Sequence, residues 1–120
     1  MNDEAFNRFC KKLPATTYVV QWGGSHVWKV GGKVFAIGGC GAFTFKTTRE
    51  DYDALIQVEG VRPAPYLASR GMSWVQDEKA PGLGEAALKE HLRLSHQIVA
   101  SGLSKKRQRE LGLIDRPESR

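Results

Sequence analysis

The sequence predicts one α+β domain, in which an antiparallel sheet is backed by helices in two layers. Three observations predict it. The apolar pattern changes from helical spacing to alternation after Pro14. Gly31-Gly32 joins two apolar runs, as in a two-residue β-hairpin. Residues 85–101 then return to helical spacing. A chain of 120 residues suits one core, and we expect residues 1–113 to form the domain and 114–120 a frayed tail.

The first half is predicted to be one helix followed by four strands. Asn2 suits the N-cap of a helix over 2–13, and Pro14 ends it. Cys10 lies on the apolar stripe of this helix, where a small core residue is expected. The expected strands are 17–22, 26–30, 33–37 and 42–46.

A two-residue turn fixes the predicted register of the hairpin. Val30 should oppose Lys33, Lys29 should oppose Val34, and Trp28 should then oppose Phe35. One face would carry the bulky set, and the other a smaller, partly basic set open to solvent. The first set is His26, Trp28, Val30, Phe35 and Ile37, and the second is Val27, Lys29, Val34 and Ala36.

The second half is predicted to hold three helices and a strand. Thr48 can cap a helix over 49–58. The prolines of 62–65 favour an extended backbone, and 72–77 is typical of a strand. After a loop over 78–84 comes the helix 85–101, with Gly102 as its C-cap. Ser104 can start a short basic helix over 104–111.

Positive charge is concentrated in the first third of the chain. The net charge is +5, and residues 5–49 contain seven basic residues and no acidic one. Such a region attracts polyanions, although solvated lysines also keep a protein soluble or block edge-to-edge aggregation. The candidate phosphate contacts are Lys29, Lys33, Lys46, Arg62, Arg70, Lys105, Lys106 and Arg107.

The sequence contains no catalytic or metal-binding motif with the required spacing. Gly32-Lys33 is followed by valine, which does not fit a P-loop, and the glycines of 38–41 lead into a strand. His91 and His96 would lie about 140° apart on a straight helix, and His26 is isolated. No nucleophile motif occurs. We expect no enzyme, no cofactor and no metal; a histidine beside a carboxylate in a pocket would revive the enzyme interpretation.

Composition also predicts where the protein resides and how its tryptophans are used. No apolar run reaches the ~18 residues that a membrane span needs. The polar N-terminus and two cysteines without CxxC spacing favour a cytoplasmic protein. We also expect a monomer. Trp22, Trp28 and Trp74 could stack on bases if exposed, but for Trp28 core packing is favoured.

Several short motifs together resemble the MmcQ/YjbR family of small bacterial proteins. They are W-x5-WKVGGKVFAI (22–37), VRPAPYL (61–67), SWV (73–75), LSHQIV (94–99) and LSKKRQREL (103–111). The order and spacing fit over nearly the whole chain. His96 stands where the family commonly has Tyr, and Ser104 where it often has Pro. The resemblance implies a frataxin-like two-layer fold and a "double wing" that binds DNA. The first helix is mostly basic, unlike the acidic iron-binding ridge of frataxins.

These observations lead to one expected function and one alternative. We expect DNA to bind through its phosphates with little sequence specificity, the Gly31-Gly32 hairpin forming one wing with Lys29, Lys33 and Lys46. The alternative is a protein-interaction or small-ligand module without a nucleic-acid role, in which 62–66 and Trp74 line a groove.

Overall fold

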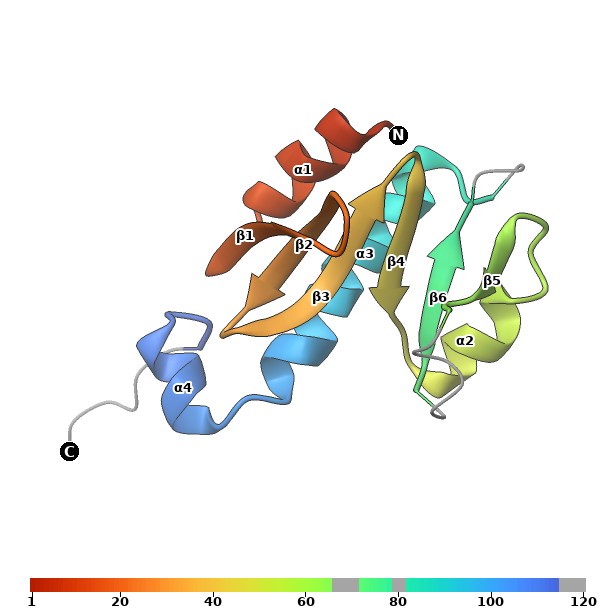
Figure 1. Cartoon of the computed structure of the whole chain (residues 1–120). Coiled ribbons are helices and arrows are strands. Elements are labelled where there is room, and N and C mark those ends of the chain that lie inside the picture. The colour runs from red at the N-terminus through yellow and green to blue at the C-terminus, as the bar shows by residue number, and fades with distance from the viewer. Residues whose placement is uncertain (66–71, 79–81, 115–120) are drawn as a thin grey trace.

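The computed structural model of the chain describes residues 1–65, 72–78 and 82–114 (Figure 1). Its elements in chain order are α1 (Asp3–Lys11), β1 (Thr16–Gln21), β2 (Ser25–Val30), β3 (Lys33–Gly39), β4 (Ala42–Lys46), α2 (Arg49–Leu55), β5 (Val61–Pro63), β6 (Trp74–Asp77), α3 (Glu85–Ser101) and α4 (Lys105–Glu110). The expected tail beyond residue 114 lies outside the described residues.

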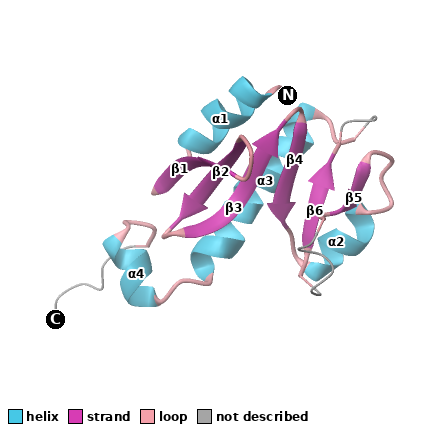
Figure 2. Cartoon of the chain, in the orientation of Figure 1, coloured by secondary structure: helices cyan, strands magenta, loops and turns pink. Residues whose placement is uncertain are grey.

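The strands form one antiparallel sheet in the order β1-β2-β3-β4-β6-β5. Helix α3 lies behind β3 and β4, and α1 packs against β1 and β3 (Figures 1 and 2). Buried side chains from α1, α2 and α3 belong to one core cluster, so these helices share one face of the sheet. We call the opposite face, which carries none of these three helices, the open face. The predicted α+β class, with an antiparallel sheet backed by helices, is confirmed.

The β2–β3 hairpin has the predicted turn but a different register farther from it. Gly31 and Gly32 have φ of 59° and 81°, the left-handed values that a primed turn requires. Lys29 pairs with Val34 as predicted, whereas Trp28 pairs with Ala36. Phe35 is therefore an extra residue in β3, which makes a β-bulge.

The bulge changes which residues of β3 face the core. Phe35 and Ala36 are both fully buried in the core cluster, and Ile37 pairs with Val27 on the open face. The predicted pairing of Trp28 with Phe35 is therefore wrong, as are the predicted faces of Ala36 and Ile37. Val27 lies on its predicted face but is fully buried instead of solvent-exposed.

Ser95 of α3 joins the sheet where the bulge interrupts it. Beyond the last β3–β4 pair, Ala36 with Phe45, the N–H of Lys46 donates to Ser95 Oγ over 2.8 Å. The Ser95 hydroxyl in turn donates to the carbonyl oxygen of Phe35 over 2.6 Å. This fully buried hydroxyl bridges β3 and β4 and satisfies two backbone groups at the bulge.

Aromatic packing holds α1 against the sheet. The ring of Phe6 stacks on that of Phe43 in β4, with 4.8 Å between the centroids. A Cβ at Gly38 would lie only 2.5 Å from Phe6 Cε2, so glycine allows this close approach. Cys10 is buried as predicted, and burial raises the pKa of its thiol. Phe6 and Cys10, which both lie on α1, belong to the core cluster.

The predicted helix starts are confirmed to within one residue, whereas α1 ends at Lys11 instead of residue 13. The side chains of Asn2, Thr48 and Ser104 each accept a hydrogen bond from the backbone N–H three residues later. Helix α3 spans 85–101 as predicted, whereas α2 ends at Leu55 instead of residue 58. The extended segment after Gly60 pairs with β6 as β5, a strand that the sequence did not predict. Among the described residues, none of the helices has the length and apolar character that a membrane span requires.

Ser95→Ala should destabilise the fold by about 1–3 kcal/mol, because it leaves the Lys46 N–H and the Phe35 carbonyl without their partner. Ser101→Ala on the same helix removes an exposed hydroxyl that donates only to Ile98 O, and should cost about 0.5 kcal/mol or less. Urea denaturation of both variants measures the difference. Equal losses would show that the buried bridge is unimportant.

His96 should make the fold less stable in mild acid. Its ring is buried, and Nε2–H donates to Pro14 O over 2.7 Å. Burial lowers its pKa, and the hydrogen bond to Pro14 offsets part of this effect. The unfolded chain then binds a proton more readily, so the free energy of unfolding should fall as pH drops below about 6.5. His96→Gln should flatten this part of the pH profile, and a variant that keeps the wild-type profile would contradict the assignment.

Candidate functional site

The tip of the β2–β3 hairpin packs against the residues that flank α4. A Cβ at Gly31 would lie 2.6 Å from Leu103 Cδ1 and 3.2 Å from Leu111 Cδ1. Leu103 is buried, and Leu111 is half-buried. In Figure 1 the hairpin tip and α4 accordingly lie side by side at one end of the molecule. Two segments about 70 residues apart in sequence therefore present their side chains together.

Helix α4 turns its charged side chains outward. Gln108 is buried, and its Nε2 donates to Leu103 O over 2.7 Å. Lys105, Lys106 and Arg107 on the same helix are exposed.

We call the cationic side chains of the hairpin tip and α4 the basic end. It consists of Lys33, Lys105, Lys106, Arg107 and Arg109. Arg107 Nη1 lies 3.8 Å from Glu110 Oε1. Among the described residues, no carboxylate forms an ion pair with the other four cations. The basic end therefore has a strong excess of positive charge.

Lys11 and Lys12 are two further exposed cations, outside the set of phosphate contacts predicted from the sequence. They end α1, and the Leu13 and Pro14 that follow line the same depression as Lys105. This depression of about 600 Å³ lies between the end of α1, α3 and α4. Its position shows that the C-terminal end of α1 lies near α4 and adds to the positive charge there. The sequence could have pointed to these two lysines, because they stand at the C-terminal end of the predicted first helix, where cations are favourable.

Lys29 and Lys46 lie on the open face, as the alternation of the strands predicts. Lys46 shares its face with Thr44, two residues earlier. Gln76 Nε2 donates to Thr44 Oγ1 over 3.2 Å. Lys29 shares its face with Val27, which pairs across the sheet with Ile37. Both lysines are partly exposed, and no ion pair to either is found in the described part of the chain.

Arg62 lies apart from the basic end, and its guanidinium group contacts Gln76 and Glu78. It belongs to β5, the strand at the far edge of the sheet. Its Nη2 donates to Gln76 Oε1 over 2.7 Å, and its Nε lies 3.0 Å from Glu78 Oε1. Arg70 lies outside the described residues. The structure therefore brings together Lys33, Lys105, Lys106 and Arg107 of the predicted set, and separates Arg62 from them.

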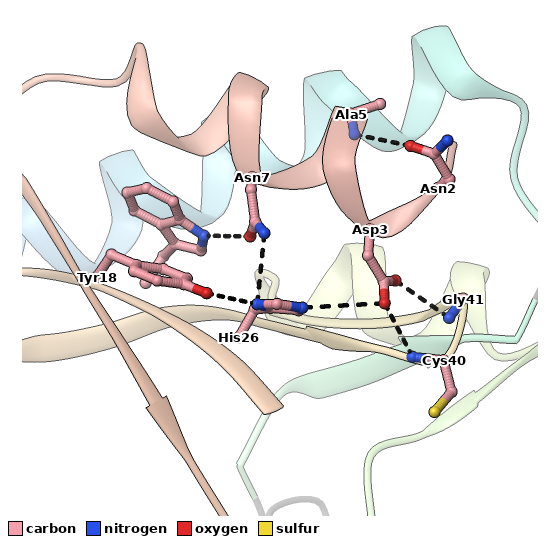
Figure 3. Close-up of polar contacts among 9 residues, drawn as sticks. Asn2, Asp3, Ala5, Asn7, Tyr18, His26, Cys40 and Gly41 are labelled. Carbon is pink, nitrogen blue, oxygen red and sulfur yellow. Dashed lines mark hydrogen bonds and ion pairs between the residues drawn. The ribbon is translucent and has the colours of Figure 1, made fainter. Parts of the chain in front are cut away.

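A second polar cluster connects α1 to the sheet (Figure 3). Tyr18 Oη lies 2.6 Å from His26 Nδ1, and His26 Nε2 lies 4.0 Å from Asp3 Oδ2. The Asp3 carboxylate accepts backbone hydrogen bonds from Cys40 and Gly41, both 3.2 Å long. Donation by Tyr18 to Nδ1 fits the tautomer that carries its proton on Nε2, facing Asp3.

Asn7 completes this cluster. Its Oδ1 accepts a 2.9 Å hydrogen bond from Trp28 Nε1, and its Nδ2 lies 3.4 Å from His26 Nδ1. The cluster thus satisfies a buried indole and fastens the first turns of α1 to β2 and to the β3–β4 turn. His26, which is isolated in the sequence, therefore has polar partners in the fold. The β1–β2 turn could have placed Tyr18 near it, but nothing in the sequence aligns α1 with the sheet.

The pair of His26 and Asp3 meets the condition that would revive an enzyme interpretation only in part. A histidine does lie beside a carboxylate, and Asp3 lines a shallow cavity of about 260 Å³ together with Cys40 and Gly39. Within the described residues, no group of three His, Cys, Asp or Glu side chains could hold a metal ion. The hydrogen bonds of the pair are directed to the fold itself, so a structural role explains them.

The tryptophans have different exposures. Trp28 is buried, as favoured from the sequence, and Trp74 is buried too. Trp22 is 65% exposed in the β1–β2 turn. The groove suggested for residues 62–66 with Trp74 is not tested, because Tyr66 lies outside the described residues.

Comparison with known proteins agrees with this architecture. The family model YjbR matches residues 11–98. The crystal structure of the Deinococcus radiodurans protein DR2400, which carries the domain DUF419, superposes with a TM-score of 0.82 and 23% sequence identity. The match covers 98% of this chain and 92% of that one, and it shows a shared fold. Comparison with curated proteins gives no significant match.

Gly31→Ala should destabilise the protein by about 1–3 kcal/mol more than Gly32→Ala does. The reason is that a methyl group at residue 31 would overlap Leu103 and Leu111, whereas one at residue 32 would not. Both glycines have positive φ, so the backbone strain is matched, and a Cβ at Gly32 would meet nothing within 4 Å. Urea denaturation of the two variants isolates the contact. Equal losses would mean that the hairpin tip does not pack on α4.

Proposed function

This chain belongs to the YjbR family, and from that premise and the geometry above we propose that its basic end binds the phosphate backbone of nucleic acid. The observation that carries the proposal is the contact of Gly31 with Leu103 and Leu111, which gathers cations from two distant segments. A one-sign cluster of this kind raises the local concentration of a polyanion and releases its counterions on binding.

The chemistry of the basic end favours phosphates over base edges. Three of its five cations are lysines, whose ammonium groups bind phosphates as point charges, whereas reading bases needs Asn, Gln or Arg placed in a groove. Of its two arginines, Arg107 lies 3.8 Å from Glu110 and Arg109 is half-buried. The nearest amide, Gln108, is buried and hydrogen-bonded to backbone carbonyls. We therefore propose binding with little sequence specificity.

We also propose that the chain acts as a binding protein and not as an enzyme. Cys10 is buried and its thiol pKa is raised, which disfavours the reactive thiolate. His96 is buried against Pro14 O, and His91 stacks on Phe45. These histidines are therefore engaged in packing.

The salt dependence of DNA affinity tests the proposal. The logarithm of affinity for a random-sequence duplex should fall linearly with the logarithm of salt concentration. Lys33→Gln and Lys106→Gln together should reduce the slope by about two, because each lysine contributes roughly one released counterion. Fluorescence anisotropy across a salt series measures this slope.

Lys89→Gln is the matched control, because Lys89 lies on α3 and pairs with Glu85 at 3.5 Å. It should leave the slope unchanged. Lys46→Gln reports on the open face, and a larger effect there than at Lys33 would move the binding surface away from the basic end. Affinity that is insensitive to salt, or an absence of binding, would refute the proposal.

A further inference from the structure

The two edges of the sheet differ in their protection. Strand β5 has three residues and carries Arg62 and Pro63, which both discourage further strand pairing. Strand β1 has six residues, TTYVVQ, with neither charge nor proline. Its pairing with β2 is regular from Thr16 to Gln21, without a bulge. In the described part of the chain β1 pairs on one side only, so its other edge presents backbone groups that a further strand can bind.

Apolar side chains are exposed at the same strand. Tyr18 is 45% exposed, Val20 is 53% exposed, and Trp22 directly after the strand is 65% exposed. Met72 is the one other large apolar residue in the described part of the chain with comparable exposure. A gathering of such residues at one place on a protein surface is typical of an interaction site.

We propose that β1 pairs antiparallel with β1 of a second copy of this chain, so that two sheets join into one. A register centred on Val19 places Val19 opposite itself, Tyr18 opposite Val20, and Thr17 opposite Gln21. Each pair combines residues from the same face, which keeps Tyr18 and Val20 on the side of α1 in both copies. This dimer would replace the monomer expected from the sequence.

The charges of α1 favour a second copy as the partner. Helix α1 packs against β1 and begins with Asp3 and Glu4, whereas its last turn contains Lys11 and Lys12 follows it. A two-fold axis at Val19 makes the two α1 helices antiparallel on one face, so the acidic first turn of each helix lies toward the basic last turn of the other.

The basic ends themselves do not oppose this arrangement. Strand β1 starts beside the hairpin tip, because Thr16 pairs with Val30. Antiparallel pairing therefore places the two basic ends at opposite ends of the joined β1 strands. Like charges are kept apart, and the uncharged strands meet at the centre. The dimer does not depend on nucleic-acid binding.

Sedimentation equilibrium from micromolar to millimolar chain, without nucleic acid, tests the proposal. The wild type should shift from monomer to dimer mass with concentration. Val20→Lys, at an exposed position, should raise the dissociation constant by about tenfold or more, because it places a charge within the apolar pairing. Val20→Thr should preserve dimerisation, and Gln57→Lys adds the same charge beyond α2 as a control.

Hydrogen exchange provides a readout that needs no variant. The amides of 17–21 should become more protected as the concentration of the wild-type chain rises. A chain that stays monomeric throughout, or a dimer that forms equally well in Val20→Lys, would overturn the proposal. So would a dimer in which exchange at 17–21 is independent of concentration.

Discussion

The contact between Gly31 and the leucines beside α4 decides where the charges of this protein gather. The turn must have two residues with positive φ, and its first residue must leave room for Leu103 and Leu111. Glycine meets both needs. Because the hairpin tip is held there, Lys33 joins the cations of α4, and two separate basic regions of the sequence become one surface. Burying part of a leucine at such a contact contributes about 1–3 kcal/mol, enough to hold a hairpin tip in place.

The bulge in β3 is the second constraint, and it shapes the sheet. It turns both Phe35 and Ala36 into the core and leaves backbone groups at Phe35 and Lys46 without a regular partner. The Ser95 hydroxyl satisfies them from α3. A single buried serine therefore adds a polar link between the strands that lead to the hairpin tip and the long helix, whose apolar side chains pack in the core. The start of α1 is fastened separately, through Asp3, Asn7 and the stacked ring of Phe6.

Local chemistry made much of this fold predictable. The caps at Asn2, Thr48 and Ser104, and the Gly31-Gly32 turn, depend on neighbouring residues, and all are found in the structure. The bulge was not predictable, because a prediction from alternation assumes that the strand is regular. The irregularity becomes visible only in the folded structure, where Phe35 and Ala36 are both buried in the core. Alternation nevertheless placed Lys46 correctly on the same face of the sheet as Thr44. The gathering at the basic end, the ion pair of Arg62 with Glu78 and the approach of Asp3 to His26 all join segments whose mutual position depends on the packed core.

The central claim is that the hairpin tip and α4 form a single phosphate-binding surface. Nuclear magnetic resonance titration of the labelled chain with a short DNA duplex tests it most directly. Backbone amides of 31–33 and 104–107 should shift together, with one apparent affinity, while the amide of Arg62 stays unchanged. Shifts confined to one of the two segments, or centred on β5 and β6, would contradict the claim.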